Sequence, residues 1–347
     1  MKLEGRQDEF IVVGENIHTT RIVLRRGKHV TLAPDGSEAI RFFNSDEEER
    51  FLLIPDGIKR TSDYEEGRVK HMSVAVKAAM AGDEPQAGIG REYLKFQIQR
   101  QVDNGADYLD INVDEISIRE HEQQDAMKWL VEFVQDNSPV PLCVDSSKTE
   151  TIEVGLKACD QRAGRPMLNS ASLERISALD LVREYNCVVI VTAAGESGMP
   201  QNAEERIDHA SRMVDAALQR GIDLSDMYVD PLMFPISVNT DSGNHVLDAI
   251  RQVRRRYGPE IHITGGFSNV SFGLPCRRLI NDVFSILAIE TGADSGIIDP
   301  VTSNPREVFN MDRSSTAFEH ARAMLLGEDK DCRVFLKAFR RKQFEGY

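Results

Sequence analysis

The chain predicts a (β/α)8 TIM barrel with an insertion after the first strand. From about residue 88 onward, short apolar segments alternate with amphipathic helical segments. Such alternation is typical of parallel strands joined by right-handed crossovers. Eight βα units in one chain fit a closed barrel better than an open sheet. Polar residues end strand after strand, at the rim where barrel enzymes build their sites.

The expected strands are short runs rich in Val, Ile, Leu and Met. They are Phe10–Gly14, Tyr108–Asn112, Pro141–Asp145, Met167–Ser170, Val188–Thr192, Met227–Asp230, His262–Gly265 and Ser295–Ile298. Two of the segments between them, within residues 126–134 and 207–218, place apolar residues at the i, i+3, i+4 spacing of a helix.

Residues 22–87 interrupt this alternation with charged and turn-forming residues. Strand-like pieces are expected at Ile40–Phe43 and Phe51–Ile54, and a helix at Val69–Ala81. A solvated decoration and a cap or docking surface beside the rim are the two interpretations. We therefore expect a barrel of residues 1–21 and 88–326. Residues 22–87 form the insertion or cap in the first βα connection, and residues 327–347 form a charged C-terminal tail.

Composition excludes several classes of function. The net charge of −14 over 347 residues argues against a nucleic-acid partner, because phosphate binding depends on Lys and Arg. No apolar run is long enough to span a bilayer, and Met1–Gly5 lacks a signal-peptide core. A cytoplasmic protein is expected. The five cysteines are scattered, and His209 and His245 lack metal-ligand spacing, so no metal site is predicted.

The segment after the strand at His262–Gly265 carries an unusual polar group. Gly265 and Gly266 let the backbone approach a ligand without a Cβ in the way. Asn269 then lies on a short loop above the sheet edge. Its amide offers a donor and an acceptor without a charge, which suits a neutral or briefly cationic nitrogen. An ordinary glycine turn capped by Asn and Ser is the alternative.

Other polar side chains are expected at the same rim, namely Asp110, Asn112, Asp145, Asn169, Thr192 and Asp230. Each could instead cap a helix, and Asp145-Ser146-Ser147 before Thr149 is the strongest capping candidate. Caps on strand after strand are less expected than a binding site. A carboxylate accepts two parallel N–H groups well, as it does from guanidinium. An amino-heterocycle such as a pterin or a purine presents such an edge.

Six segments that carry these residues occur in a recognisable order. They are VGENI (13–17), GADYLDIN (105–112), VDSSK (144–148), LNSAS (168–172), VDPL (229–232) and GGFSNVSFGLP (265–275). Together they resemble the pterin-binding family that includes dihydropteroate synthase. They are most similar to its methyltetrahydrofolate:corrinoid methyltransferase branch and to the folate module of cobalamin-dependent methionine synthase. The resemblance covers residues 10–21 and roughly 88–325.

The resemblance implies roles for individual residues. Asp145, Asn169 and Asp230 hold the pterin, and Asn269 contacts the methyl-bearing nitrogen and is the catalytic residue. Dihydropteroate synthases have a catalytic lysine at the place of Asn269, so the amide favours the methyltransferase branch. Further residues are candidates for lining the same pocket: Asp110, Asn112 and Gly266.

Two arginines after the asparagine loop have no single implied role. Arg277 and Arg278 stand at offsets different from those of the arginines in methionine synthase modules. They are assigned either to the glutamate tail of the folate or to a partner protein.

The implied reaction moves a methyl group between a nitrogen of methyltetrahydrofolate and the cobalt of a corrinoid (cobalamin). A tertiary amine is a poor leaving group, so the nitrogen must be protonated or strongly hydrogen-bonded. No side chain that titrates near neutral pH is indicated, so an extended network including water is expected to deliver the proton. The chain has no Asp-x-His-x-x-Gly motif, so the corrinoid is expected on a separate protein.

The resemblance also implies a homodimer, and it leaves the direction of transfer open. Two alternatives remain from other functional classes. One is a dihydropteroate synthase-type pterin enzyme, and the other is a non-catalytic pterin-binding partner of a corrinoid protein.

Overall fold

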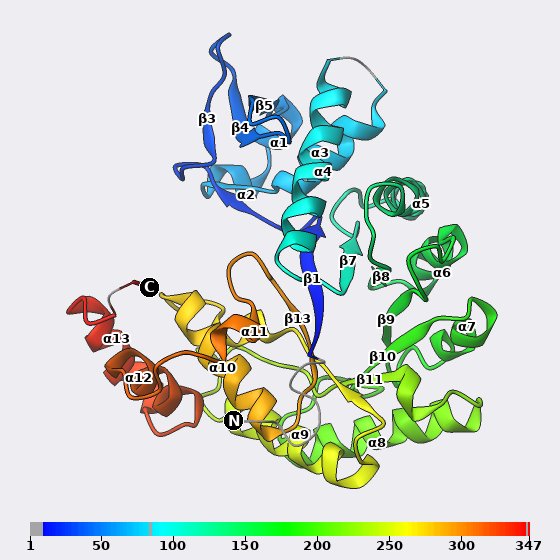
Figure 1. Ribbon diagram of the computed structural model, residues 1–347, viewed down its shortest axis with the longest axis vertical. Coiled ribbons are helices and arrows are strands. Elements are labelled where there is room, and N and C mark those ends of the chain that lie inside the picture. Colours follow the sequence, from blue (N-terminus) through cyan, green and yellow to red (C-terminus); the bar gives the residue numbers. More distant parts are fainter. Residues whose placement is uncertain (1–9, 83–84, 345) are drawn as a thin grey trace. The chain divides into compact units, whose positions relative to one another are not determined.

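A computed structural model describes residues 10–82, 85–344 and 346–347. All eight predicted parallel strands form, and helices separate them along the chain (Figure 1). The sheet order is β12-β11-β10-β9-β8-β7-β1-β13, and a parallel bridge between Gly266 and Ile297 joins the two ends of that order. The predicted α/β barrel fold is therefore confirmed. The strands are β1 (Ile11–His18), β7 (Tyr108–Asn112), β8 (Leu142–Asp145), β9 (Met167–Ala171), β10 (Val188–Thr192), β11 (Met227–Asp230), β12 (His262–Ile263) and β13 (Ser295–Ile298).

One principal helix lies between each strand and the next or follows the last strand. These helices are α4 (Gln86–Asp103), α5 (Glu120–Gln135), α6 (Thr149–Ala158), α7 (Ala178–Glu184), α8 (Ala203–Gln219), α9 (Ser242–Tyr257), α10 (Arg277–Thr291) and α12 (Thr316–Leu325). Shorter helical segments are η2 (Leu224–Asp226), η3 (Phe267–Ser271), α11 (Pro305–Val308), η4 (Lys330–Cys332) and α13 (Arg333–Arg340).

The chain divides into two compact units. The C-terminal unit contains the described residues up to Gly14, Asn104–Asp107 and the described part of 167–347. Its core is the parallel sheet β9 to β13, in which every residue of β10 is buried. Such strands read as continuous apolar runs because helices cover parallel sheets on both faces. This unit positions the strand ends that carry Asn169, Asp230 and Asn269.

The N-terminal unit contains the described part of 15–103 together with residues 108–166. It includes β7 and β8, which pair in parallel from Leu109 opposite Leu142 to Asn112 opposite Asp145. This register brings the polar ends of the two strands level. The unit therefore positions the predicted site residues Asp110, Asn112 and Asp145.

Residues 22–87 fold into two small antiparallel sheets and three helices of the N-terminal unit. Strands β3 to β5 form one sheet, and β2 pairs with β6. The strand-like pieces form at nearly the predicted positions, but Val69 belongs to a strand and the following helix begins only at His71. The elements are β2 (Val23–Leu24), β3 (Val30–Leu32), β4 (Glu38–Phe43), β5 (Glu49–Leu53), α1 (Asp56–Lys59), α2 (Ser62–Glu65), β6 (Arg68–Val69) and α3 (His71–Met80).

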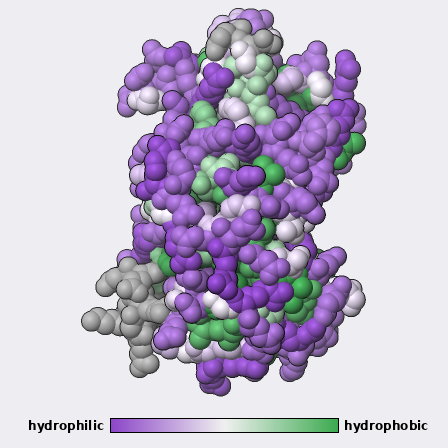
Figure 2. All heavy atoms as spheres, turned by 90° about the vertical axis from the view of Figure 1, so that its right-hand side faces the viewer, coloured by the Kyte–Doolittle hydropathy of each residue, from purple (hydrophilic) through white to green (hydrophobic). Residues whose placement is uncertain are grey.

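Polar side chains dominate one face of the molecule (Figure 2). Hydrophilic side chains cover most of the face seen in Figure 2, and apolar side chains form small separate groups there. Within the described parts of the chain, no helix is both long enough and apolar enough to cross a membrane.

Candidate functional site

Neighbouring strands of the C-terminal unit carry three predicted site residues. Asn169 lies on β9, Asp230 ends β11, and Asn269 lies on η3 just after β12. Strands β9 to β12 pair in order, with Thr192 at the end of β10 opposite Asp230. Because the carboxyl ends of parallel strands meet at one edge, these residues share the rim where barrel sites form.

Asp230 is a buried carboxylate held by its own loop. Its side chain is 8% exposed, and Oδ1 accepts a hydrogen bond of 2.7 Å from the backbone N–H of Leu232. Burial raises the pKa of Asp230 to about 6, while the Leu232 N–H and the charge of Arg206 act in the opposite direction. The carboxylate is thus poised to ionise just below neutral pH and to accept hydrogen bonds.

Arg206 on α8 holds the same loop and was not predicted from the sequence. Its side chain is 1% exposed. Nε and Nη2 donate to the carbonyl of Leu232 at 3.4 and 3.3 Å. Nη1 donates to the carbonyls of Asn202 and Pro200 at 3.0 and 3.4 Å. Leu232 has a left-handed φ of 64°, which is costly for a leucine, and this contact restrains it.

The two glycines before Asn269 make room for neighbouring site side chains. A Cβ on Gly265 would stand 3.0 Å from Oδ1 of Asp230, and a Cβ on Gly266 would stand 2.8 Å from Nδ2 of Asn269. The second distance is shorter than real Cβ atoms allow. The side chain of Asn269 itself is exposed. The glycine pair therefore allows both polar groups to lie against the backbone.

Arg277 braces the loop that carries Asn269. Its Nε donates to Oγ of Ser271 at 3.0 Å, and its Nη2 donates to the carbonyl of Ser268 at 2.9 Å. The guanidinium also lies 5.8 Å from the ring centre of Phe272. These contacts give Arg277 a role in holding the asparagine loop, whatever else its exposed side chain binds.

The N-terminal unit brings together the other predicted residues. Asp110 and Asn112 are buried on β7, and Nδ2 of Asn112 donates to Oδ2 of Asp145 at 2.8 Å. The capping alternative for Asp145 is wrong: the N-cap of α6 is Lys148, without a side-chain hydrogen bond. Asp145 instead accepts across the sheet from Asn112. It is therefore not a helix cap, and its role as a site carboxylate stays a prediction.

His18, at the end of β1, joins this group and was missed by the sequence analysis. Its Nε2 lies 2.7 Å from Oδ2 of Asp110, and the two side chains are only 16% and 1% exposed. Burial lowers the pKa of His18. The carboxylate of Asp110, and then those of Asp145 and Glu15, outweigh burial and raise the pKa to about 9. His18 is thus an imidazolium at neutral pH.

Two nearby charges of opposite sign act on the pKa of Asp145. Burial and then the carboxylate of Asp110 raise its pKa, to about 7, while His18 and the amide of Asn112 lower it. One ligand atom each from His18, Asp110 and Asp145 lies within 4.8 Å of the others, a spacing in which a divalent cation could be held. In the structure, however, the His18–Asp110 hydrogen bond places a proton between two of these atoms.

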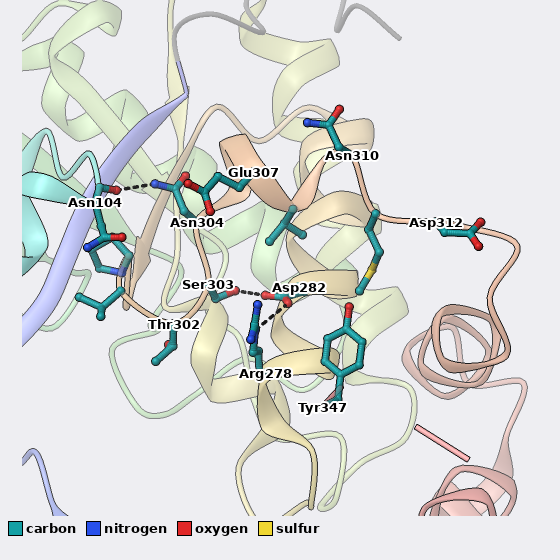
Figure 3. A pocket seen from close by; sticks show the side chains of 14 residues that line it. Asn104, Arg278, Asp282, Thr302, Ser303, Asn304, Glu307, Asn310, Asp312 and Tyr347 are labelled. Atoms are coloured by element: carbon teal, nitrogen blue, oxygen red, sulfur yellow. Dashed lines mark hydrogen bonds and ion pairs between the residues drawn. The ribbon is translucent and has the colours of Figure 1, made fainter. Parts of the chain in front are cut away.

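Arg278 lies on the wall of a cavity in the C-terminal unit (Figure 3). Its Nε is 3.6 Å from Oδ2 of Asp282, whose pKa burial raises to about 6. The cavity, of about 510 Å³, is also lined by Glu307, Asp312 and Tyr347. Its carboxylates would repel a glutamate tail, so Arg278 is better explained by its pairing with Asp282.

Residues 92–299 match the family model described as pterin binding enzyme. That match covers more than half of the chain. The chain belongs to the pterin-binding enzyme family. The carboxylates and amides described above in each unit are candidate site residues of a pterin-binding enzyme.

Two curated relatives support this membership. The methylcorrinoid:tetrahydrofolate methyltransferase of Eubacterium limosum is 29% identical over 257 residues, which are 72% of this chain and 87% of the relative. The methionine synthase of Mycobacterium tuberculosis is 29% identical over 248 residues, 65% of this chain. The match covers only 20% of that longer protein.

Solved structures show the same fold. The dihydropteroate synthase of Xanthomonas albilineans in complex with 7,8-dihydropteroate has a TM-score of 0.51 at 19% identity, over 66% of this chain and 86% of that one. The Yersinia pestis enzyme with a pterine-sulfa conjugate has a TM-score of 0.51 at 20% identity, over 63% and 86%. At these identities the likeness concerns the fold alone.

The two site residues that sequence reasoning missed left weak signals. His18 directly follows the matched segment that ends at Ile17, so it stands at the end of the first strand like the other rim residues. Arg206 lies on the buried face of α8 with Ala203 and Ala210, and a cation on an apolar stripe needs a buried partner.

Proposed function

We propose that this pterin-binding enzyme transfers a methyl group between methyltetrahydrofolate and the cobalt of a corrinoid on a separate protein. The observation that carries the proposal is Asn269, an exposed neutral amide on the loop after β12. An amide can hydrogen-bond a tertiary amine in either protonation state, whereas a lysine there would serve a different reaction. The relative from Eubacterium limosum, named for methyl transfer between a methylcorrinoid and tetrahydrofolate, supports this choice.

The pterin ring would be held by the remaining rim residues. Its guanidine-like edge would donate to the carboxylates of Asp145 and Asp230, and the amide of Asn169 would satisfy neighbouring ring groups. Charge-assisted pairs of this kind are strong and directional. A site built for such an edge rejects ligands that lack it, because buried carboxylates would be left unpaired. The buried carboxylate of Asp230, the half-buried carboxylate of Asp145 and the room left by Gly265 and Gly266 fit this heterocycle.

Methyl transfer requires the nitrogen of the folate to become a better leaving group. The corrinoid supplies a nucleophilic cobalt that takes up the methyl group, or returns it in the opposite direction. Asn269 accepts a hydrogen bond from the protonated nitrogen and donates to its lone pair after transfer. Arg277 keeps the loop of Asn269 in place, so the amide needs little reorganisation during the reaction.

The partners follow from the same proposal. The sequence lacks an Asp-x-His-x-x-Gly motif, so the corrinoid would arrive on a separate corrinoid protein that docks beside the rim. We also propose a homodimer, as the family resemblance implies. Light scattering of the purified chain, alone and with a candidate corrinoid protein, tests both statements.

A spectroscopic experiment tests the proposed reaction. The protein is mixed with cob(I)alamin and methyltetrahydrofolate, and then with methylcobalamin and tetrahydrofolate, while the corrinoid spectrum is recorded. Interconversion of cob(I)alamin and methylcobalamin in either direction supports the proposal. Formation of dihydropteroate from para-aminobenzoate and the pterin pyrophosphate would contradict it. Pterin binding without either reaction, even with corrinoid proteins present, would indicate a non-catalytic partner.

A further inference from the structure

The group around His18 contains one basic side chain and two acidic ones. Two carboxylates, Asp110 and Asp145, lie beside one imidazole in the N-terminal unit. Only His18 and Asp110 are joined directly, at 2.7 Å. Asp145 is joined instead to Asn112, at 2.8 Å. Asp145 is therefore a carboxylate whose direct partner is neutral, with a like charge and an opposite charge nearby.

The ionised form of Asp145 is the form that pterin recognition needs. A protonated carboxyl group offers one donor and loses the paired acceptors that face a guanidine-like edge. Burial and Asp110 both favour the protonated form. The opposing influences are the charge of His18 and the hydrogen bond from Asn112. Without the imidazolium, the buried carboxylate of Asp110 and the half-buried carboxylate of Asp145 would remain together, and such a pair retains a proton.

We propose that His18 is a positioning residue whose imidazolium, fixed by Asp110, keeps Asp145 in the carboxylate form that binds the pterin. This inference rests on the proposed function, because it assigns the pterin to Asp145. His18 acts through Asp145 and need not touch the substrate. Pterin binding at Asp145 should therefore depend on pH.

Other described residues also act on the pair. Glu15 adds a third carboxylate that favours the imidazolium, and Arg21 pairs with Glu15 at 3.1 Å. Asp114 acts on Asp145 in the same direction as Asp110, and it accepts hydrogen bonds from Ser146 and Ser147. His18 is therefore a cation that offsets these carboxylates at Asp145.

A pH dependence follows. Pterin affinity rises with pH through about 7, as Asp145 ionises. Loss of the His18 proton near pH 9 does not reprotonate Asp145, because the carboxyl group has already ionised. In His18→Gln this rising limb moves to higher pH. An opposite charge at this range shifts a carboxyl pKa by about 1–3 units, so at pH 7 we expect roughly 5- to 500-fold weaker binding of methyltetrahydrofolate.

Asp110→Asn is the matched control. It removes the like charge beside Asp145, but it also removes the carboxylate that holds the imidazolium, so His18 should lose its proton at lower pH and the rising limb should move less than in His18→Gln. The double variant His18→Gln/Asp110→Asn removes one charge of each sign and should bind methyltetrahydrofolate more tightly at pH 7 than His18→Gln alone. A role of His18 in packing would not produce this rescue.

A measurement without folate separates the inference from the proposed function. In the ligand-free protein with ¹⁵N-labelled histidine, the His18 imidazole signal, assigned with His18→Gln, should remain protonated until about pH 9. His71 serves as an internal reference, because burial lowers its pKa to about 3. If the His18 signal is that of a neutral imidazole at pH 7, the inference is wrong.

The other outcomes also support or overturn the role proposed for His18. Stoichiometric Zn²⁺ binding that requires His18 would overturn the inference, because a metal needs the neutral imidazole. Unchanged pH profiles in His18→Gln, or no rescue by the double variant, would overturn it as well. If the wild type binds no folate at any pH while His18 titrates near 9, the electrostatic inference holds and the proposed function fails.

Discussion

Replacement of Arg206 offers a direct test of how the C-terminal unit holds Asp230. Arg206→Met keeps much of the aliphatic length of the side chain and a good helix former, but it removes every hydrogen bond of the guanidinium. Three backbone carbonyls, those of Pro200, Asn202 and Leu232, lose their contact with it. A buried acceptor left without a partner costs about 1–3 kcal/mol.

The magnitude can be worked from these contacts. The contacts with Pro200 and Leu232 are long, at 3.3–3.4 Å, so we take the lower part of that range for each carbonyl. The carbonyl of Asn202 still accepts from the backbone N–H of residue 206 at 3.4 Å, so two carbonyls lose their donor, at a sum of about 2–3 kcal/mol of unfolding free energy. The variant no longer buries a guanidinium, which offsets part of this loss and leaves about 1–2 kcal/mol. Arg206→Lys keeps the charge but cannot span three carbonyls, so it should fall between the wild type and Arg206→Met.

A functional consequence should accompany the loss of stability. Once Leu232 is released from its left-handed conformation, its N–H no longer points reliably at Asp230. The pKa of Asp230 then rises, because that N–H and the charge of Arg206 both lower it. Urea unfolding and calorimetric titration with methyltetrahydrofolate measure the two effects. A loss below about 1 kcal/mol in Arg206→Met, or equal folate affinity at pH 6 in both proteins, would refute this reasoning.

Three further predictions use other parts of the molecule. Asn269→Ala should slow methyl transfer by roughly 10²-fold in stopped-flow assays while folate remains bound; an unchanged rate would contradict its role. Gly243→Ala places a Cβ 2.0 Å from the carbonyl oxygen of Leu325 and should cost about 3 kcal/mol or more in urea unfolding, whereas Gly57→Ala, with open space around it, should not destabilise. The pKa of Asp294 is lowered despite burial, through His262, the Ile263 N–H and Arg254. The ionised carboxylate of Asp294 therefore stabilises the fold above its unfolded pKa of about 4, and this stabilisation is lost as the pH falls. Asp294→Asn should flatten the fall of unfolding free energy at acid pH, and an unchanged fall would contradict the role given to Asp294.

Buried strands were the most predictable part of the fold. Val188–Thr192 and Met227–Asp230 form as predicted, because parallel strands covered on both faces are continuous apolar runs. The ends of other strands were wrong. β1 continues four residues beyond Gly14 to His18, since its polar residues are buried by partners elsewhere in the chain. β12 is only His262–Ile263, because the glycines after it turn into η3.

The site residues at the ends of strands were predictable, and the residues that pair with them through long-range contacts were not. Strand order alone places Asp110 and Asp145 at the ends of neighbouring strands. The histidine that pairs with Asp110 lies 92 residues away in the sequence, and no local pattern indicates that pairing. Arg206 was hidden in the same way, because its partners are backbone carbonyls of two separate loops. Sequence patterns thus reveal which residues end strands, but not the cations that face them.

His18 and Arg206 each oppose the effect of burial on a carboxyl group, one in each unit. Burial moves the pKa of Asp145 to about 7 and that of Asp230 to about 6, yet recognition of a guanidine-like edge needs both as carboxylates. A charge must therefore oppose burial in each unit. Arg206 is permanently charged, whereas His18 loses its charge when its proton leaves near pH 9. The carboxylate of Asp230 is thus supported at all physiological pH values. In the proposed site Asp145 has the higher of the two carboxyl pKa values and depends on protonated His18 at neutral pH, so we expect the acid limit of pterin binding to come from the N-terminal unit.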